Sequence, residues 1–285
     1  MNSPTPISIT ITKSDGTRQA FQPEKLANSL RKVGTSPATI TEITAEVERT
    51  MSEGMSTADI YRQAFDLLKK HHHPTAVKYS IRRAIMELGP DGFPFERFVA
   101  RIFRLWGYET LTDQTVMGTC IPHEIDVIAW KKDKLVFVEA KYHNEFNMKS
   151  DSKVALYIQA RREDVSGILY DYGGIKRHID EFWLITNTKF SDQAIKYGEC
   201  EGLKLVGWNY PAKGNLHDII EQNGLHPITT MASLSRDQKR DLIGRGIMVC
   251  IDIIGNPTVL DQVGVRGDAK ERVLTEAQMI IEQAK

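Results

Sequence analysis

The stretch HEIDVIAWKKDKLVFVEAKYH, residues 123–143, decides the fold of the central part of the chain. Val, Ile, Phe and Trp dominate residues 124–130 and 135–141, and this composition favours two β-strands. The charged run KKDK between them favours a turn. If the turn is tight, Trp130 pairs with Leu135 and the two strands form an antiparallel hairpin.

Each of these strands contains an acid, although strands this apolar belong in a core. Counting back from the turn places Asp126 opposite Glu139 and Glu124 opposite Lys141. Opposed residues share a face of the sheet, and residues two apart on one strand point the same way. One face is therefore predicted to collect Asp126, Glu139 and Lys141. A loop one residue longer or shorter would turn one acid to the opposite face.

Two carboxylates held this close out of water repel each other unless a cation lies between them. Mg²⁺ (or Mn²⁺) suits such a pair, because it combines one or two carboxylates with waters and phosphate oxygens. A neighbouring lysine can orient or help to deprotonate the attacking water. The pattern therefore indicates metal-dependent hydrolysis of a phosphodiester. The alternative is an exposed hairpin with a solvated ion cluster, but both acids lie in near-continuous apolar runs.

The order of elements around the hairpin resembles the PD-(D/E)XK nuclease superfamily, and more narrowly the Mrr-like restriction endonuclease domains. The resemblance implies that Asp126 and Glu139 bind the metal, that Lys141 is the catalytic lysine and that Glu96 is a supporting acid. The common variant of the family has Gln at the position of Glu139. The match covers about residues 92–210, and its elements are Phe95-Glu96, Gly107-Tyr108, Asp126, Glu139-Ala140-Lys141, Thr186-Asn187, Phe190-Ser191 and Ala194.

Composition excludes several classes of protein. A chain of 285 residues suits two or three domains, each able to bury a core. Lys+Arg and Asp+Glu both number 37, so any binding of a polyanion needs a local basic patch. Cys120, Cys200 and Cys250 stand apart without CxxC spacing, which argues against a zinc site or disulfide framework. No apolar run approaches the roughly 20 residues of a membrane span, and the polar N-terminus does not resemble a signal peptide. We expect a soluble cytoplasmic protein with no membrane partner.

The N-terminal part is predicted to be a β-hairpin followed by a helical bundle. Residues 7–12 and 18–21 alternate like strands around the turn Ser14-Asp15-Gly16-Thr17. Apolar residues then recur at helical spacing in four segments separated by Gly, Ser and Pro. These segments are residues 24–33, 39–51, 57–70 and 76–88.

This part resembles the ATP-cone, a nucleotide-binding regulatory domain, through its hairpin lysine, the following helix and the run TADIY at residues 57–61. The resemblance implies ATP or dATP as an effector. Many members have a second basic residue where this chain has Ser14. The alternative is a bundle that kept the shape but lost the ligand, or that only dimerises. The predicted nucleotide-binding residues are Lys13, Ser14, Gln19, Gln22, Lys25, Thr57 and Tyr61.

The rest of the central part is predicted to be mixed α/β. Glu96 lies in the first turn of a helix whose apolar stripe packs on the sheet. Residues 150–172 are predicted to form one long helix, on which Arg161 and Arg162 are candidate DNA-binding residues, although such charges usually form a solvated face. A β-α-β unit follows, with strands at residues 182–188 and 203–208.

The C-terminal part has short helical segments separated by Gly-rich turns, and it resembles a helix-hairpin-helix unit. Such turns present backbone N–H groups to a phosphate. The candidate DNA-binding residues are Arg245, Arg266 and Lys270. A small packing or dimerisation module is an equal alternative.

The predicted fold class is therefore α/β multidomain. It comprises an N-terminal hairpin plus helical bundle (residues 1–89), a central mixed-sheet restriction-endonuclease-like core (90–224) and a small all-α module (225–285). The leading hypothesis is a nucleotide-regulated, Mg²⁺-dependent endonuclease that cuts DNA, with a defence-like role implied by the resemblance. Since a duplex cut needs two active sites, a homodimer or higher homo-oligomer is expected. The alternatives are a structure-specific or RNA-directed nuclease, and a nucleotide-sensing DNA-binding regulator that does not cut.

Overall fold

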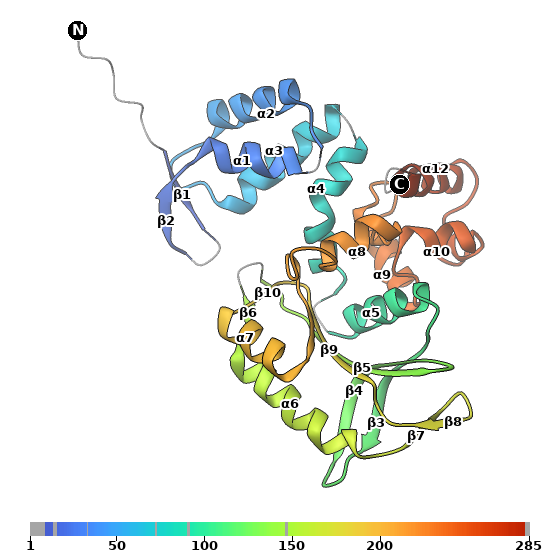
Figure 1. The fold of residues 1–285 in the computed structure, drawn as a ribbon. Helices are drawn as coiled ribbons and strands as arrows, with labels where there is room; N and C mark the ends of the chain where they lie inside the picture. Colours follow the sequence, from blue (N-terminus) through green and yellow to red (C-terminus); the bar gives the residue numbers. More distant parts are fainter. Residues whose placement is uncertain are drawn as a thin grey trace. The chain divides into compact units, whose positions relative to one another are not determined.

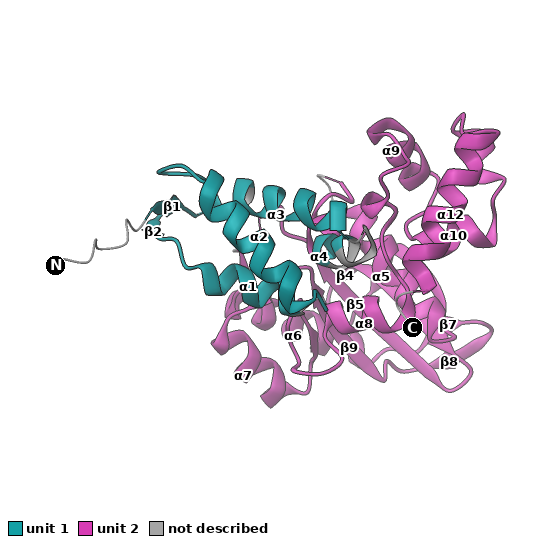
Figure 2. Ribbon diagram, turned by 90° about the horizontal axis from the view of Figure 1, so that it is seen from above, with its two compact units in different colours: residues 1–81 teal, residues 82–285 magenta. Residues whose placement is uncertain are grey.

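A computed structural model describes residues 9–13, 16–32, 34–71, 73–89, 92–145 and 148–282. The chain divides into two compact units, residues 1–81 and 82–285 (Figures 1 and 2). The division falls before the predicted boundary at residue 89, and it keeps the predicted central and C-terminal domains in one unit. The three-domain division of the chain remains a prediction.

The first unit contains the predicted hairpin and helices. Its core is built from residues that recur at helical spacing, among them Leu30, Ile43, Val47 and Leu68. A proline begins each of the first two helices. Proline is favourable there because a backbone N–H in the first turn would have no acceptor within the helix. The elements are β1 (Thr10–Thr12), antiparallel to β2 (Arg18–Ala20), then α1 (Pro23–Lys32), α2 (Pro37–Thr50), α3 (Thr57–His71) and α4 (His73–Met86), which begins in this unit.

The second unit is organised around a five-stranded mixed sheet, as predicted, with strand order β11-β9-β5-β4-β3. On one side of the sheet, β3 and β5 each pair antiparallel with β4. On the other side, β5 and β11 each pair parallel with β9. The strands are β3 (Glu109–Met117), β4 (Pro122–Lys131), β5 (Lys134–Lys141), β9 (Glu181–Thr186) and β11 (Lys204–Val206).

Helices cover both faces of this sheet (Figure 1). On one face lies α5 (Phe93–Leu105), whose Phe103 ring centroid is 5.4 Å from that of Trp183 on β9. On the other lie α6 (Ser152–Ser166) and α7 (Asp192–Glu201), which share a core with Phe137. Burial on both faces is the reason why β5 reads as a continuous apolar run rather than an alternating one.

Two sequence predictions for this unit were wrong or incomplete. The predicted helix over residues 150–172 ends at Ser166, because Gly167 follows and Tyr170 turns into the core. Residues Tyr170–Tyr172 form β7, which pairs with β8 (Ile175–Arg177). Strand β3 was not predicted, because this edge strand is half exposed and has the polar sequence ETLTDQTVM.

Two further short strands lie beyond the carboxyl ends of β5 and β9. They are β6 (Lys149–Ser150) and β10 (Lys189–Phe190), which pair in parallel.

The C-terminal segment is helical, as predicted, and it is packed into the second unit. Arg101 on α5 forms an ion pair of 2.9 Å with Asp252, and the buried Glu276 accepts hydrogen bonds from the backbone N–H groups of Ala232 and Ser233. The elements are α8 (Leu216–Asn223), the 3₁₀ turn η1 (Ile228–Thr230), α9 (Arg236–Gly244), α10 (Cys250–Gly255), α11 (Val259–Gln262) and α12 (Asp268–Glu282).

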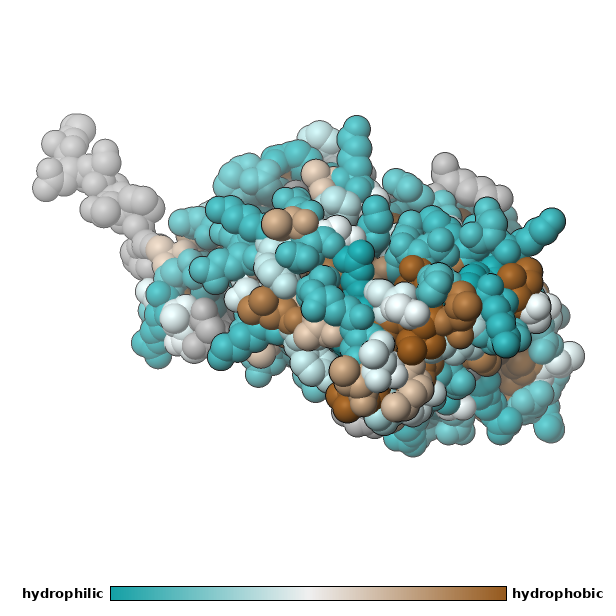
Figure 3. All heavy atoms as spheres, turned by 60° about the horizontal axis from the view of Figure 1, so that its bottom comes forward, coloured by the Kyte–Doolittle hydropathy of each residue, from teal (hydrophilic) through white to brown (hydrophobic). Residues whose placement is uncertain are grey.

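The surface is mostly hydrophilic on the face shown in Figure 3, where separate apolar patches interrupt it. Exposed apolar side chains include Met117 and Ile121, on either side of the β3–β4 turn. In the part of the chain that the structure describes, no helix is both long and apolar enough to cross a bilayer.

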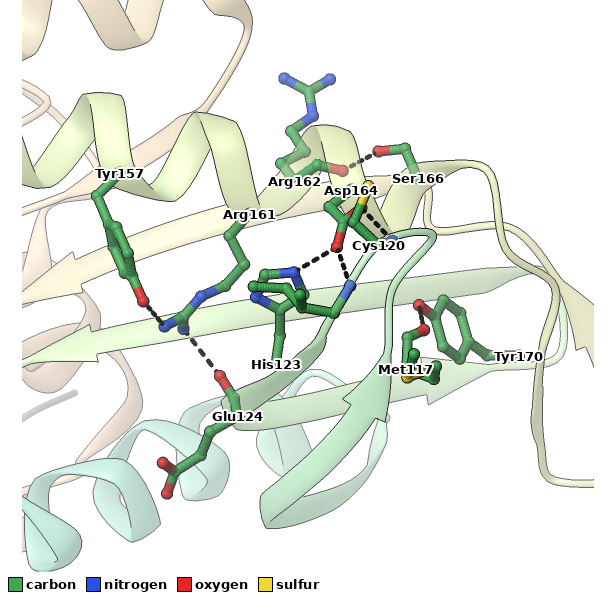
Figure 4. A network of polar contacts seen from close by, with 11 residues as sticks. Met117, Cys120, His123, Glu124, Tyr157, Arg161, Arg162, Asp164, Ser166 and Tyr170 are labelled. Carbon is green, nitrogen blue, oxygen red and sulfur yellow. Dashed lines mark hydrogen bonds and ion pairs between the residues drawn. The ribbon is translucent and has the colours of Figure 1, made fainter.

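Asp164 on α6 fixes the β3–β4 turn (Figure 4). Its carboxylate accepts hydrogen bonds from the backbone N–H groups of Cys120 (2.8 Å) and Ile121 (3.2 Å), and it contacts Nε2 of His123 at 2.7 Å. A Cβ added to Gly118 would lie 2.2 Å from this carboxylate, so the turn needs glycine there. The hydrogen bond with His123, with help from the backbone donors, lowers the pKa of Asp164 to about 2.

We expect Asp164→Asn to lower the urea-unfolding midpoint at neutral pH. The amide N–H₂ of Asn is itself a donor, and it would face the backbone N–H groups of Cys120 and Ile121. The pKa of Asp164 lies below its ordinary value of 3.8 in the folded protein, so its carboxylate contributes stability above that pH. The contribution is lost as the pH falls toward 2. The difference between wild type and variant should therefore narrow below about pH 4. Asp171→Asn, at an exposed position on β7, is the control, and a constant difference down to about pH 2.5 would contradict the assignment.

Candidate functional site

The β4–β5 hairpin has the predicted register. Trp130 pairs with Leu135 across a two-residue turn, and the last paired residues are Val127 and Val138. The next positions on the same count are Asp126 and Glu139, and backbone pairing between the two strands ends there.

Counting back along both strands from the turn also predicted that Glu124 lies opposite Lys141. This part was wrong, because the β4–β5 pairing ends before it reaches these residues. Glu124 pairs with Thr115 of β3 on the other side of β4.

Asp126 is the one residue of β4 that pairs with neither neighbouring strand. On the β3 side its opposite residue would be Asp113, which has φ = 63°, in the left-handed region. The Gln114 side chain donates to the carbonyl of Thr112 at 2.8 Å and so stabilises this kink. A non-glycine residue in this region costs about 1–3 kcal/mol and persists only where the surroundings enforce it. The interruption leaves the Asp126 carboxylate free to accept a hydrogen bond of 2.7 Å from the backbone N–H of Ala140.

Asp126 and Glu139 lie at this interruption, and Glu96 on α5 is near enough for its pKa to respond to the charge of Asp126. Burial raises the pKa of Glu139 to about 8, and the charge of Asp126 adds to the rise. Burial raises the pKa of Asp126 to about 6, against the opposing hydrogen bond from Ala140. Burial also raises the pKa of Glu96, in the first turn of α5, to about 7, and here too the Asp126 charge contributes. The structure thus brings together the two predicted metal ligands and the predicted supporting acid.

A divalent cation fits this group, because it would compensate carboxylate charges that burial disfavours. No cluster of three or more His, Cys, Asp or Glu side chains is arranged to hold a metal within the described residues. The protein would therefore supply Asp126 and Glu139, and waters or phosphate oxygens would complete the coordination, as Mg²⁺ prefers. The supporting role of Glu96 stays a prediction.

Arg161 on α6 forms an ion pair with the Glu139 carboxylate, and both side chains are mostly buried. Its guanidinium also donates to the carbonyl of Glu124 at 2.8 Å and to the hydroxyl of Tyr157 at 2.9 Å (Figure 4). Arg161 therefore stands beside the site and compensates part of its negative charge.

Arg162 points away from the site and donates to the carbonyl of Glu201 at the end of α7, at 2.6 Å. Sequence reasoning could not separate these two neighbouring arginines. A role in DNA binding stays a prediction for both.

Asn187 holds the chain just after Lys141, a role that the sequence analysis did not assign. Lys141 is the last residue of β5 and is exposed, and it pairs with Thr186 of β9. The residue that follows β9, the fully buried Asn187, accepts from the N–H of His143 at 2.8 Å and donates to its carbonyl at 2.8 Å. This two-point contact fixes the backbone that follows the lysine. The only sequence signal for it was the Thr186-Asn187 pair within the family resemblance.

The end of α4 also contacts this region. The hydroxyl of Tyr142 donates to the carbonyl of Met86 at 2.6 Å, and the amide of Asn187 lies 3.0 Å from the Met86 sulfur. The first of these contacts gives a partner to a backbone carbonyl at the helix end, where no intrahelical donor is available.

The predicted nucleotide-binding residues of the first unit occupy the hairpin and the starts of two helices. Lys13 follows β1, Gln19 pairs with Ile11 on the hairpin, and Gln22 precedes α1, where Lys25 lies exposed in the first turn. Ser14 lies outside the described residues.

Thr57 begins α3, and Tyr61 belongs to the bundle itself. Tyr61 stacks on Tyr79 with ring centroids 4.7 Å apart, and its hydroxyl donates to the Tyr79 carbonyl. Its side chain is thus already engaged by the protein. Nucleotide binding by the seven residues stays a prediction.

The predicted DNA-binding residues of the C-terminal segment lie around glycine turns. Gly246, Gly264 and Gly267 have positive φ, as turns of this kind require. Arg245 donates to the Gln262 side chain, and Lys270 forms an ion pair of 2.7 Å with Asp261, whereas Arg266 is exposed. These roles also stay predictions.

Three protein families match consecutive parts of the chain. They are the ATP cone domain over residues 9–87, the restriction endonuclease domain over residues 89–209 and the AF1548-like C-terminal domain over residues 226–281. An uncharacterized protein of Archaeoglobus fulgidus is 33% identical over 184 residues, which are 64% of this chain and 99% of that protein.

The solved structures that match the chain include the following two. The crystal structure of AF1548, a protein of unknown function, is 32% identical, with a TM-score of 0.55 over 67% of this chain and 99% of that one. The MspJI restriction endonuclease in complex with a 27-mer oligonucleotide is 12% identical, with a TM-score of 0.30 over 84% of this chain and 48% of that one. The second likeness is too low to support an argument.

The fold, the site and the matched families define the class of protein: a restriction-endonuclease-like domain with an ATP cone domain before it. The chain belongs to the AF1548-like family, since it spans 99% of a relative with which it shares 33% identity. The C-terminal segment that resembled a helix-hairpin-helix unit matches the C-terminal domain of this family.

The left-handed conformation of Asp113 can be tested by substitution. We expect Asp113→Val to lower the free energy of unfolding by about 1–2 kcal/mol, because a β-branched residue is strained at positive φ. Asp113→Gly and Asp113→Asn should cost far less, since both residues tolerate this region, and the Asn variant also controls for the lost charge. Urea unfolding would measure all three. Equal stability of the Val and Gly variants would contradict the conformation.

Proposed function

We propose that this protein is a nucleotide-regulated, Mg²⁺-dependent endonuclease that hydrolyses DNA phosphodiester bonds. The observation that supports it best is that Asp126 and Glu139 lie close together where the backbone pairing of the sheet is interrupted. Lys141 lies two residues after Glu139 on β5. This arrangement occurs in a domain that matches the restriction endonuclease family.

Each residue of the site has its own proposed role. Asp126 and Glu139 would hold the metal, and Glu96 would support them electrostatically. Mg²⁺, when bound, stabilises the negative charge that develops on a phosphate as water attacks it. Lys141, exposed at the strand end, can donate to a phosphate oxygen or orient the attacking water. Arg161 can give up its contact with Glu139 and bind a phosphate, for which a guanidinium is well suited.

DNA is the proposed substrate because of the match to the restriction endonuclease family. A role in defence against foreign or modified DNA would follow from the same match. The catalytic residues contact only the phosphodiester, so a screen of methylated, unmethylated, branched and single-stranded DNA and of RNA would define the preferred substrate. We further propose a homodimer or higher homo-oligomer in the cytoplasm, since cutting both strands needs two sites.

Cleavage of plasmid DNA in Mg²⁺ tests the catalytic assignment. We expect Asp126→Ala and Lys141→Ala each to lower the cleavage rate at least about 100-fold, because one removes a metal ligand and the other a donor to the reacting phosphate. EDTA should abolish cleavage by the wild type.

Matched controls come from the turn of the same hairpin. Asp133→Ala and Lys132→Ala alter exposed residues of the same types at the opposite end of β5 and should cut normally. Normal cutting by Asp126→Ala and Lys141→Ala would refute the site. A wild type that binds DNA but does not cut it in Mg²⁺ or Mn²⁺ would favour the alternative of a DNA-binding regulator.

ATP or dATP is the proposed effector because the first unit matches the ATP cone domain. Lys13 after β1 and Lys25 in the first turn of α1 are the proposed phosphate contacts, with Gln19, Gln22, Thr57 and Tyr61 around them. The N-terminus of α1 also offers backbone N–H groups to a phosphate.

We expect isothermal titration calorimetry to detect binding of ATP or dATP to the full chain. Lys25→Ala should weaken the affinity about tenfold by removing one charged phosphate contact, whereas Lys69→Ala, at an exposed position near the end of α3, should leave it unchanged. Absence of heat at millimolar nucleotide would leave the ATP cone domain without a nucleotide role.

A further inference from the structure

We infer that Lys149 and Lys189 form a phosphate-binding subsite, beside Lys141, for the backbone of a polynucleotide strand. This inference rests on the proposed nuclease function and specifies how the substrate is held. The two lysines lie on β6 and β10, the short strands that follow the active-site ends of β5 and β9.

The register of these two strands sets the lysines side by side. Lys149 pairs with Lys189, and Ser150 pairs with Phe190. Ser150 and Phe190 are buried, whereas both lysines are exposed. Because successive residues of a strand point to opposite faces and paired strands lie about 4.8 Å apart, the two ammonium groups share the outer face.

Two like charges at directly opposed positions are unfavourable unless an anion compensates them. Neither lysine forms an ion pair with a carboxylate of the described residues. A phosphate between them would remove the repulsion and bind both ammonium groups.

The strand pair is held close to the catalytic lysine through His143. Asn187 brackets the backbone of His143, two residues after Lys141, and Nε2 of His143 lies 3.0 Å from the hydroxyl of Ser150. Ser150 is adjacent to Lys149, and Asn187 is two residues before Lys189. Short hydrogen bonds thus connect both lysines to the end of β5.

The chemistry of the site indicates the class of ligand. Two ammonium groups without a matching acceptor or an aromatic platform recognise a phosphate and not a base. Lys149 and Lys189 lie on the short strands that follow β5, which ends at Lys141, and β9. They therefore suit a backbone phosphate next to the bond to be cut. We therefore expect contacts that are independent of sequence.

The salt dependence of DNA binding tests this subsite. Fluorescence anisotropy with a duplex oligonucleotide, in Ca²⁺ instead of Mg²⁺, would give the affinity of the full chain over a range of KCl concentrations. We expect the double variant Lys149→Gln/Lys189→Gln to bind about 10-fold to 100-fold more weakly. Its slope of log K against log salt should be smaller by about 1, since the one phosphate held between the two lysines accounts for about 0.9.

The matched control is Lys132→Gln/Lys176→Gln, which removes two exposed lysines at the other end of the sheet. We expect it to keep the wild-type affinity and slope, and thermal unfolding should show that both double variants are folded. If the Lys149/Lys189 variant binds with the slope and affinity of the control, the subsite is refuted.

Plasmid cleavage measured in parallel separates this inference from the proposed function. One outcome is that the wild type cuts, Asp126→Ala does not, and the Lys149/Lys189 variant binds DNA normally. This outcome would support the proposed nuclease function and refute the phosphate subsite. If the variant loses affinity and slope although the wild type does not cut, the subsite stands and hydrolysis falls. A wild type that binds no duplex overturns both.

Discussion

The structure depends on the interruption of backbone pairing at Asp126. In the interior of a sheet each strand residue is normally held by its neighbours, and an ionised acid there would be costly. Asp113 leaves the extended conformation on one side, and the β4–β5 pairing ends on the other. The Asp126 carboxylate therefore finds a backbone donor, Ala140, and a place beside Glu139. Local strain at one residue thus creates a polar site within an apolar hairpin.

The acids gathered there determine what can bind. Burial and mutual repulsion raise the pKa values of Glu96, Asp126 and Glu139, so the group favours either protons or a cation. Arg161 supplies one positive charge from α6. In the proposed function, a divalent ion would supply more positive charge at the same place, and a phosphate would then bind Arg161. The same imbalance of charge explains why a carboxylate pair, a lysine and an arginine lie so close together in an otherwise hydrophobic sheet.

The carboxyl ends of β5 and β9 form the other half of the site. Lys141 is the last residue of β5 and pairs with Thr186 of β9. Asn187 holds the chain that follows by bracketing the backbone of His143, and Ser150 contacts the ring of the same histidine. The end of α4 contacts Tyr142 and Asn187 through Met86. The C-terminal segment contacts α4 in turn, because the hydroxyl of Thr229 donates to the carbonyl of Ala84. A few hydrogen bonds thus connect these elements to the backbone that follows Lys141.

The sequence by itself determined the hairpin, its register near the turn, the bundle of the first unit and the mixed sheet, because hydrophobic periodicity and turn chemistry are local properties. Residue spacing also predicted that Asp126, Glu139 and Lys141 share a face, and the family resemblance added Glu96; the roles of these residues stay predictions. Only the tertiary structure decided that Asp113 is left-handed, that Arg161 rather than Arg162 faces the acids, and that residues 170–172 leave the helix for the core. These outcomes depend on contacts between residues far apart in the chain, such as Arg161 with Glu139 and Asn187 with His143. Composition and spacing do not encode such contacts, since they arise only when packed elements compete for the same donors, acceptors and space.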